Sequence, residues 1–172
     1  LLGLLVAWSV SGLLLAFGAM VAFVARTPLK TVLVDRRRGR RLARTRLASL
    51  VLAAELVALG ALALGAFVAT DDRRFWAPLA CAAPLVIVEL WFDMRSKGRR
   101  VIPELAGTIG IGSVAAAIAL ADRRSTAVAI GLWLVIAARG GAAVPYVRTQ
   151  IFRLHGRAPR RAVADLAQVV AV

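Results

Sequence analysis

Cysteine, histidine and acidic residues are scarce in this chain of 172 residues. It has one cysteine, one histidine and nine aspartates or glutamates. The single Cys81 excludes a disulfide within the chain, and a lone His155 in a basic segment offers no cluster of cysteine and histidine metal ligands. Because 23 residues are lysine or arginine, the shortage of acids leaves a formal net charge of +14.

Charged residues are also nearly absent from several long apolar runs. Sixty per cent of the residues are hydrophobic and the mean hydropathy is +0.79. A soluble domain of this length cannot bury so much apolar surface, and the runs approach or exceed the roughly 20 residues that cross a bilayer. We predict a single all-α transmembrane bundle over residues 1–172. Its five expected spans are 4–24, 47–70, 75–94, 102–121 and 126–147, with a sixth helix beginning near Ala162.

The cations gather between the apolar runs in alternating heavy and light groups. Nine lie in residues 26–46, two in 73–74, four in 95–100, two in 123–124 and five from Arg148 onward. This alternation predicts that the starting end is outside the cell membrane and that the heavily basic loops are cytoplasmic. We therefore expect anionic lipid headgroups, and not nucleic acid, as the partners of these cations.

Two further features bear on the ends of the spans. In residues 27–41, the apolar residues Leu29, Val32, Leu33 and Val34 lie among the cations, which fits either a short helix on the membrane surface or a solvated basic loop. The sequence begins without a methionine and stops within the apolar stretch 166–172. We interpret it as a piece of a longer protein, whose other helices would be partners of this bundle.

Five ionisable residues lie in or beside the spans, and the predicted topology places all of them in the cytoplasmic half of the membrane. Glu89 and Asp93 are four residues apart, so on a helix they share one face about 6 Å apart along the axis. Glu104 suits the positive end of its helix. Glu55 and Arg139 each lie about 13 Å inside the cytoplasmic boundary by helical rise, which predicts an ion pair between them.

These groups support two readings that the residues alone leave open. In the first, they form structural pairs: Glu55 with Arg139, Asp93 with a nearby cation, and Glu104 with its own helix end. In the second, they line a polar cavity open to the cytoplasm and form a working site.

Several short motifs together resemble the YwiC-like family of bacterial membrane proteins. The resemblance covers most of the chain and implies a helical protein of several spans without an established activity. The motifs are 26–30 (RTPLK), 35–41 (DRRRGRR), Glu89-x3-Asp93 with Arg99 and Arg100, 103–107 (PELAG), and Ala138-Arg-Gly with Val147-Arg148.

The layout of that family is in turn similar to UbiA-type prenyltransferases, which bind an isoprenyl diphosphate through Mg²⁺ held by Asp-rich motifs. By that resemblance Glu89 and Asp93 would hold Mg²⁺, and Lys97, Arg99 and Arg100 would hold the diphosphate of this or another phosphorylated lipid. The sequence departs from the enzyme pattern: it has one acidic pair, Glu replaces Asp, and Lys97 stands four residues after Asp93.

Two other classes of function remain open. A transporter of protons or a small anionic solute would rely on Glu55, Glu89 and Arg139 at mid-depth. A structural membrane subunit would pair every charge and need no cavity.

Overall fold

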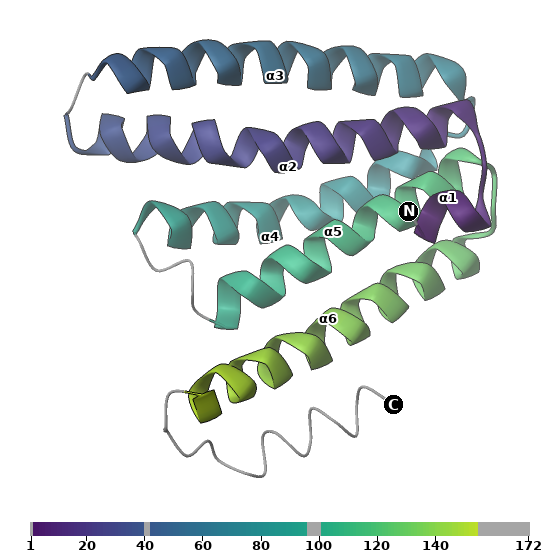
Figure 1. Ribbon diagram of the computed structural model, residues 1–172. Helices are drawn as coiled ribbons and strands as arrows, with labels where there is room; N and C mark the ends of the chain where they lie inside the picture. The colour runs from purple at the N-terminus through teal and green to yellow at the C-terminus, as the bar shows by residue number, and fades with distance from the viewer. Residues whose placement is uncertain (1, 40–41, 96–100, 155–172) are drawn as a thin grey trace.

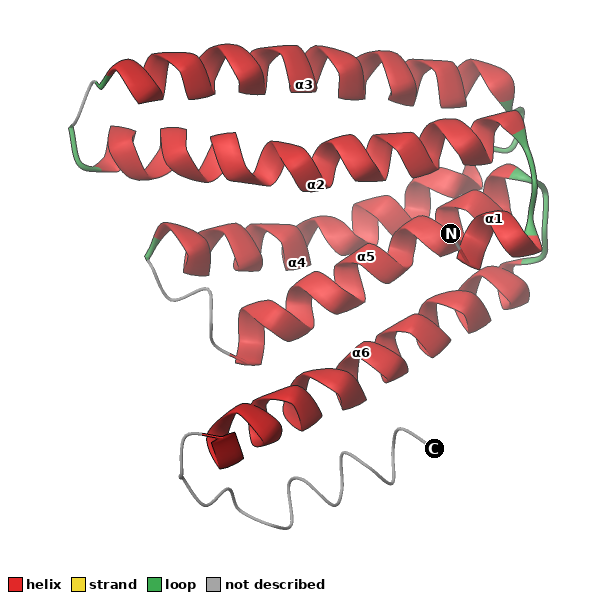
Figure 2. Ribbon diagram, in the orientation of Figure 1, coloured by secondary structure: helices red, strands yellow, loops and turns green. Residues whose placement is uncertain are grey.

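Long helices account for nearly all of the structure, a computed structural model that describes residues 2–39, 42–95 and 101–154 (Figures 1 and 2). The α-helices are α1 (Leu2–Val6), α2 (Val10–Arg37), α3 (Ala43–Ala69), α4 (Trp76–Met94), α5 (Val101–Ala121) and α6 (Thr126–Leu154), and a 3-10 turn, η1 (Arg73–Phe75), precedes α4. Five of these helices, α2 to α6, are long and apolar enough to cross a membrane. The predicted all-α, multi-pass architecture is therefore confirmed.

The five long helices alternate in direction and form a row (Figure 1). The α2–α3 hairpin lies at one edge, α4 and α5 lie in the middle, and α6 forms the opposite edge. Helix α3 packs chiefly against α2 and α6 chiefly against α5, whereas α5 contacts α1, α2, α4 and α6. Most of α5 is consequently buried, while both edge helices expose their apolar side chains to the space that lipid fills.

The core gathers around the small residues in the second half of α5. Phe75 is fully buried against a run of alanines in α5 and Ala129 of α6. Small side chains let helices approach closely, which is how packing replaces the hydrophobic effect inside a bilayer. Trp133 of α6 donates from its indole N–H to the carbonyl of Ile109 at 2.8 Å, fixing the two helices in register.

The first span differs from its predicted form at both ends. The first helix, α1, ends at Val6, and a new helix, α2, begins at Val10. Ser9 caps α2 by accepting a hydrogen bond from the backbone N–H of Gly12 at 3.0 Å. At its other end α2 continues through Pro28 to Arg37, where Gly39 follows with a positive φ of 62°. Residues 27–37 are thus neither a separate surface helix nor a loop, because α2 continues without a break to Arg37 and buries Val32.

The last span also differs, since α6 extends to Leu154 instead of ending at residue 147. The predicted sixth helix near Ala162 lies outside the described residues.

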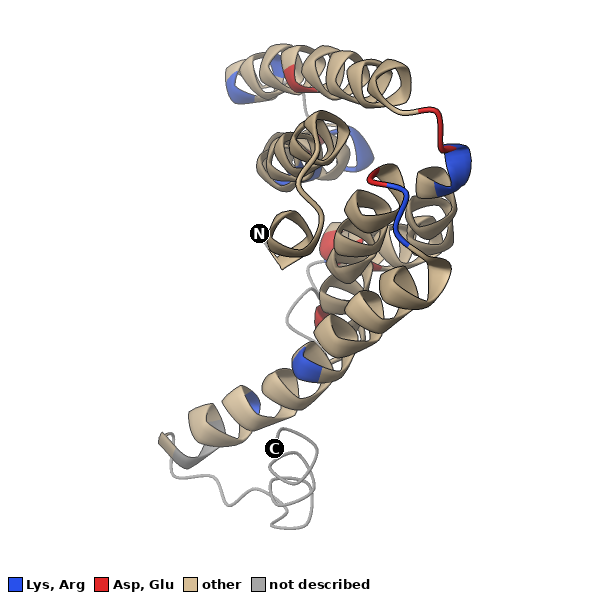
Figure 3. Cartoon of the chain, turned by 90° about the vertical axis from the view of Figure 1, so that its right-hand side faces the viewer, with Lys and Arg blue, Asp and Glu red and all other residues tan. Residues whose placement is uncertain are grey.

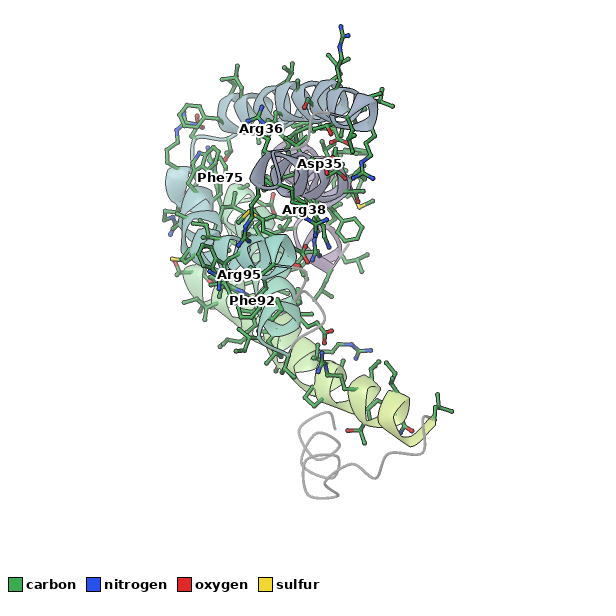
Figure 4. All side chains as sticks on the ribbon, turned by 90° about the vertical axis from the view of Figure 1, so that its left-hand side faces the viewer. Asp35, Arg36, Arg38, Phe75, Phe92 and Arg95 are labelled. Atoms are coloured by element: carbon green, nitrogen blue, oxygen red, sulfur yellow. The ribbon has the colours of Figure 1, made fainter. Side chains whose placement is uncertain are left out.

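The two ends of the bundle differ in charge. We call the end where α2, α4 and α6 finish the basic end. Figure 4 looks onto it and shows Arg36, Arg38 and Arg95 there. The opposite end carries the turns before α4 and before α6, with acidic and basic residues close together (Figure 3).

Candidate functional site

Four charged residues of α2 and α4 meet near the basic end. Arg26 and Lys30 are one turn apart on α2, and Glu89 and Asp93 are one turn apart on α4. The two helices run in the same direction, so their one-turn spacings match and bring each cation beside an acid (Figure 1). We call these four residues the α2–α4 cluster.

Arg26 joins both carboxylates of the α2–α4 cluster. Its Nη1 lies 2.6 Å from Glu89 Oε1, while Nη2 and Nε donate to Asp93 Oδ2 at 2.8 and 3.0 Å. Lys30 Nζ lies 3.5 Å from the other oxygen of Asp93. Asp93 therefore has a cation on each carboxylate oxygen, and such charge-assisted contacts offset much of the cost of taking it out of water.

Burial divides the α2–α4 cluster into inner acids and outer cations. The side chain of Asp93 is 5% exposed and that of Glu89 is 18% exposed, whereas Arg26 and Lys30 are 40% and 47% exposed. Glu89 lies against α5 at Gly107, where a Cβ atom would come within 2.8 Å of Oε1. Solvent or a ligand can thus reach the cations without displacing the acids from the helix interface.

Helix length predicts that the α2–α4 cluster lies in the headgroup region of a bilayer. Counting about 20 residues from Val10, the length that crosses the hydrocarbon core, reaches the segment between Arg26 and Lys30. On α4, Glu89 and Asp93 fall in the last two turns before Arg95. Both counts place the four charges at the same boundary.

A second ion pair links α5 to α6. Arg148 of α6 donates from Nε to Glu104 Oε2 at 2.8 Å and from Nη2 to Oε1 at 3.3 Å. Glu104 does lie in the first turn of its helix, as predicted, but it also holds α6 to α5. Arg148, which the predicted topology places in a basic loop, thus belongs to a helix and to an interhelical ion pair.

A third ion pair closes the α2–α3 hairpin. Asp35 is almost completely buried, and it accepts hydrogen bonds from Arg44 and from the hydroxyl of Thr45 at 2.7 Å.

The neighbouring Arg36, Arg37 and Arg38 are exposed and have no ion-pair partner among the described residues. Arg95 stacks its guanidinium 4.2 Å from the ring centre of Trp91. The basic end therefore presents several free positive charges around the α2–α4 cluster.

Glu55 and Arg139 do not meet. Glu55 lies on α3 and Arg139 on α6, the helices at opposite edges of the row (Figure 1). Glu55 Oε2 is buried without a hydrogen-bond partner among the described residues. The predicted ion pair is wrong, because matched depth says nothing about which helices are neighbours in the plane of the membrane.

The predicted Mg²⁺ ligands, Glu89 and Asp93, contact the guanidinium group of Arg26 in the structure. Mg²⁺ is usually bound through one or two carboxylates plus phosphate and water. Here Arg26 contacts both Glu89 and Asp93, Lys30 adds a second cation, and no three metal-ligating side chains meet among the described residues. The charges are already balanced, so this arrangement does not fit a resident Mg²⁺. The predicted diphosphate ligands Lys97, Arg99 and Arg100 lie outside the described residues.

Arg26 and Lys30 are the site residues that the sequence reading missed. The sequence predicts them as cations of a loop, because they follow the predicted end of the first span at residue 24. Their spacing of four matches that of Glu89 and Asp93, and this shared one-turn period was the signal that could have paired them.

Comparison with known proteins places the chain in a family. The model described as YwiC-like protein matches residues 1–119, more than half of the chain. No curated protein and no solved structure matches. The matched segment holds α1 to α4 and nearly all of α5, so it contains all four residues of the α2–α4 cluster. The chain therefore belongs to the YwiC-like protein family.

Proposed function

We propose that this membrane protein binds the headgroup of a phosphorylated lipid at the α2–α4 cluster, and that the basic end faces the cytoplasm. The observation that carries the proposal is the contact of Arg26 with both Glu89 and Asp93 while its own side chain stays 40% exposed. An arginine in this position can turn from an internal carboxylate to an external phosphate without leaving the helix interface.

Phosphate and carboxylate oxygens make the same kind of contact with guanidinium groups. Arginine binds either group with two parallel N–H donors, and lysine binds phosphate as a point charge. A phosphate would take the place of Glu89 on Arg26, while Asp93 keeps the arginine and Lys30 in position. The two acids would thus act as internal counterions that preorganise the cations and lower their affinity for weaker anions.

The surroundings of the α2–α4 cluster favour a lipid over a soluble anion. The cluster lies at headgroup depth, and the flanking α2 and α4 side chains expose apolar surface at Phe23, Ile87 and Trp91. The free cations Arg36, Arg37 and Arg38 add a positive field on the same end, which attracts anionic headgroups. The excess of cations in the loops at this end also supports its cytoplasmic orientation.

The test is equilibrium binding of the purified protein in detergent to geranylgeranyl diphosphate and to phosphatidic acid, with phosphatidylcholine as the neutral-headgroup reference. We expect the two phosphorylated lipids to bind with and without EDTA. Arg26→Gln should weaken their binding about tenfold or more, because it removes a charge-assisted contact. Lys30→Gln should weaken it less, since Lys30 reaches only the outer oxygen of Asp93.

Arg123→Gln is the matched control. Arg123 is an arginine paired with an aspartate, Asp71, but it is exposed at the opposite end of the bundle. Its substitution should leave lipid binding unchanged. Equal affinity for all three lipids, or unchanged binding in well-folded Lys30→Gln and Arg26→Gln proteins, would refute the proposal. Binding that requires Mg²⁺ would instead support the metal site predicted at Glu89 and Asp93.

A structural role is the second candidate, and one observation favours it. Seven of the eight acids within the described residues have a salt bridge, and three of these sets join different helices or the two arms of the α2–α3 hairpin. Ion pairs of this kind can hold neighbouring helices in register. If no lipid binds selectively while substitutions in the α2–α4 cluster destabilise the protein, this role is the one that remains.

A further inference from the structure

A separate pocket lies between α2 and α3, away from the α2–α4 cluster. It has a volume of about 370 Å³ and opens to the surface of the bundle. Its lining residues are Met20, Val21, Val24, Ala54, Glu55 and Ala58. Five of the six are apolar, so Glu55 is the one charged residue among the described residues that line the pocket.

Glu55 lacks what a carboxylate in hydrocarbon requires. It lies near the middle of α3, about 18 Å from Ala43 by helical rise. Its Oε2 is buried and has no hydrogen-bond partner among the described residues. An unpartnered polar atom at this depth is costly, and ionisable residues within spans usually face a partner, a cavity or a substrate path.

None of the other lining side chains can satisfy Glu55. Met20, Val21 and Val24 of α2, and Ala54 and Ala58 of α3, carry no N–H or O–H donor. No cation of α2 or α3 forms a salt bridge with Glu55 within the described residues, and those of Arg26, Lys30 and Arg44 are directed to other acids. A donor for this carboxylate is therefore one feature that we expect of a ligand in the pocket.

We propose that this pocket binds a lipophilic amine, a molecule with one protonated amino group and an apolar body. The ammonium supplies a hydrogen-bond donor and a positive charge to the carboxylate of Glu55, which lines the pocket, and the body fills the space between the methionine, valine and alanine side chains. The opening lies on the lipid-facing hairpin, so such a molecule reaches the pocket from the bilayer. This ligand is opposite in charge to the phosphorylated lipid of the α2–α4 cluster, and the two sites are independent.

Three amphiphiles of equal chain length test the assignment. Binding of radiolabelled octylamine, octanol and octanoate is measured by equilibrium dialysis on the purified protein in detergent, with protein-free micelles as the background. We expect saturable binding of octylamine, about tenfold or more tighter than that of octanol, and no saturable binding of octanoate.

Variants of α3 separate the carboxylate from the space around it. Glu55→Gln keeps the shape and should abolish the preference for octylamine, whereas Glu55→Asp should retain part of it. Ala58→Leu fills the pocket and should weaken octylamine and octanol alike. Leu64→Ala, a change on the exposed part of the same helix, should leave both unchanged.

Two outcomes would overturn the assignment. One is equal binding of the three amphiphiles, which would mean that the pocket binds any alkyl chain regardless of the charge of its headgroup. The other is undiminished octylamine preference in a folded Glu55→Gln protein, with folding verified by thermal melting. Neither outcome bears on phosphorylated-lipid binding, because Glu55 is not part of the α2–α4 cluster.

Discussion

Arg26 holds two acids with one guanidinium group, and its loss would leave Asp93 buried with only the weaker contact to Lys30. We expect Arg26→Gln to lower the free energy of unfolding by about 1–3 kcal/mol, since a buried charged acceptor loses its best donors. Asp93→Asn should cost a similar amount. The double variant should cost clearly less than the sum, because both changes break the same contact.

Reversible unfolding in mixed micelles measures these free energies. A double-mutant cycle on the pair Asp71 and Arg123 serves as the reference. Both side chains of that pair are mostly exposed, at 88% and 70%. Exposed pairs contribute at most about 1 kcal/mol, so this cycle should show little coupling. Additive losses at Arg26 and Asp93 would mean that the two side chains do not interact in the folded protein.

Helix α6 depends on close contact with α5, because it packs chiefly against that one helix. Gly140 lies where a Cβ atom would be 2.8 Å from the Cβ of Thr108, closer than two carbon atoms can pack. Gly141, the next residue, has no atom within 4 Å of the same position. The two glycines therefore have different roles although they are adjacent in the sequence.

We predict that Gly140→Ala lowers the free energy of unfolding by about 1–3 kcal/mol, as overpacking at a helix interface does. Gly141→Ala should be neutral or stabilising by up to about 1 kcal/mol, because alanine restricts the unfolded chain more than glycine. Thr108→Gly combined with Gly140→Ala should recover part of the loss. Equal effects of the two single substitutions would show that α6 is not docked through Gly140.

The whole molecule has one heavily basic end and one end where acids and bases alternate. Arg38 is exposed at the basic end, and Asp71 is exposed in the turn before α4 at the opposite end (Figures 3 and 4). In cells, the positive-inside preference should place Arg38 in the cytoplasm and Asp71 outside. The orientation can be measured directly because one cysteine, Cys81, is all that has to be removed.

In a Cys81→Ser background, we expect Asp71→Cys to react with an impermeant maleimide in intact cells. Arg38→Cys should react only after the membrane is permeabilised. The inverse labelling pattern would reverse the orientation and place the α2–α4 cluster at the outer surface, while labelling of both positions in intact cells would contradict the five-span topology.

The length and spacing of the apolar runs were enough to predict a helical membrane protein with five spans. Hydrophobic run length and the alternation of basic loops are local properties, and in hydrocarbon a chain must satisfy its backbone within each helix. The one-turn spacing of Glu89 and Asp93 likewise follows from helix geometry alone, and so does the position of Glu104 in the first turn of its helix.

Which charges meet depends instead on how the helices are arranged side by side. Arg26 faces Glu89 and Asp93 because α2 lies beside α4, and Glu55 is far from Arg139 because α3 and α6 lie at opposite edges of the row. The lateral order of helices depends on the packing of small residues along α5, a many-body property that no single segment encodes. Depth along the membrane normal can be counted from the sequence, whereas neighbours within its plane have to be observed.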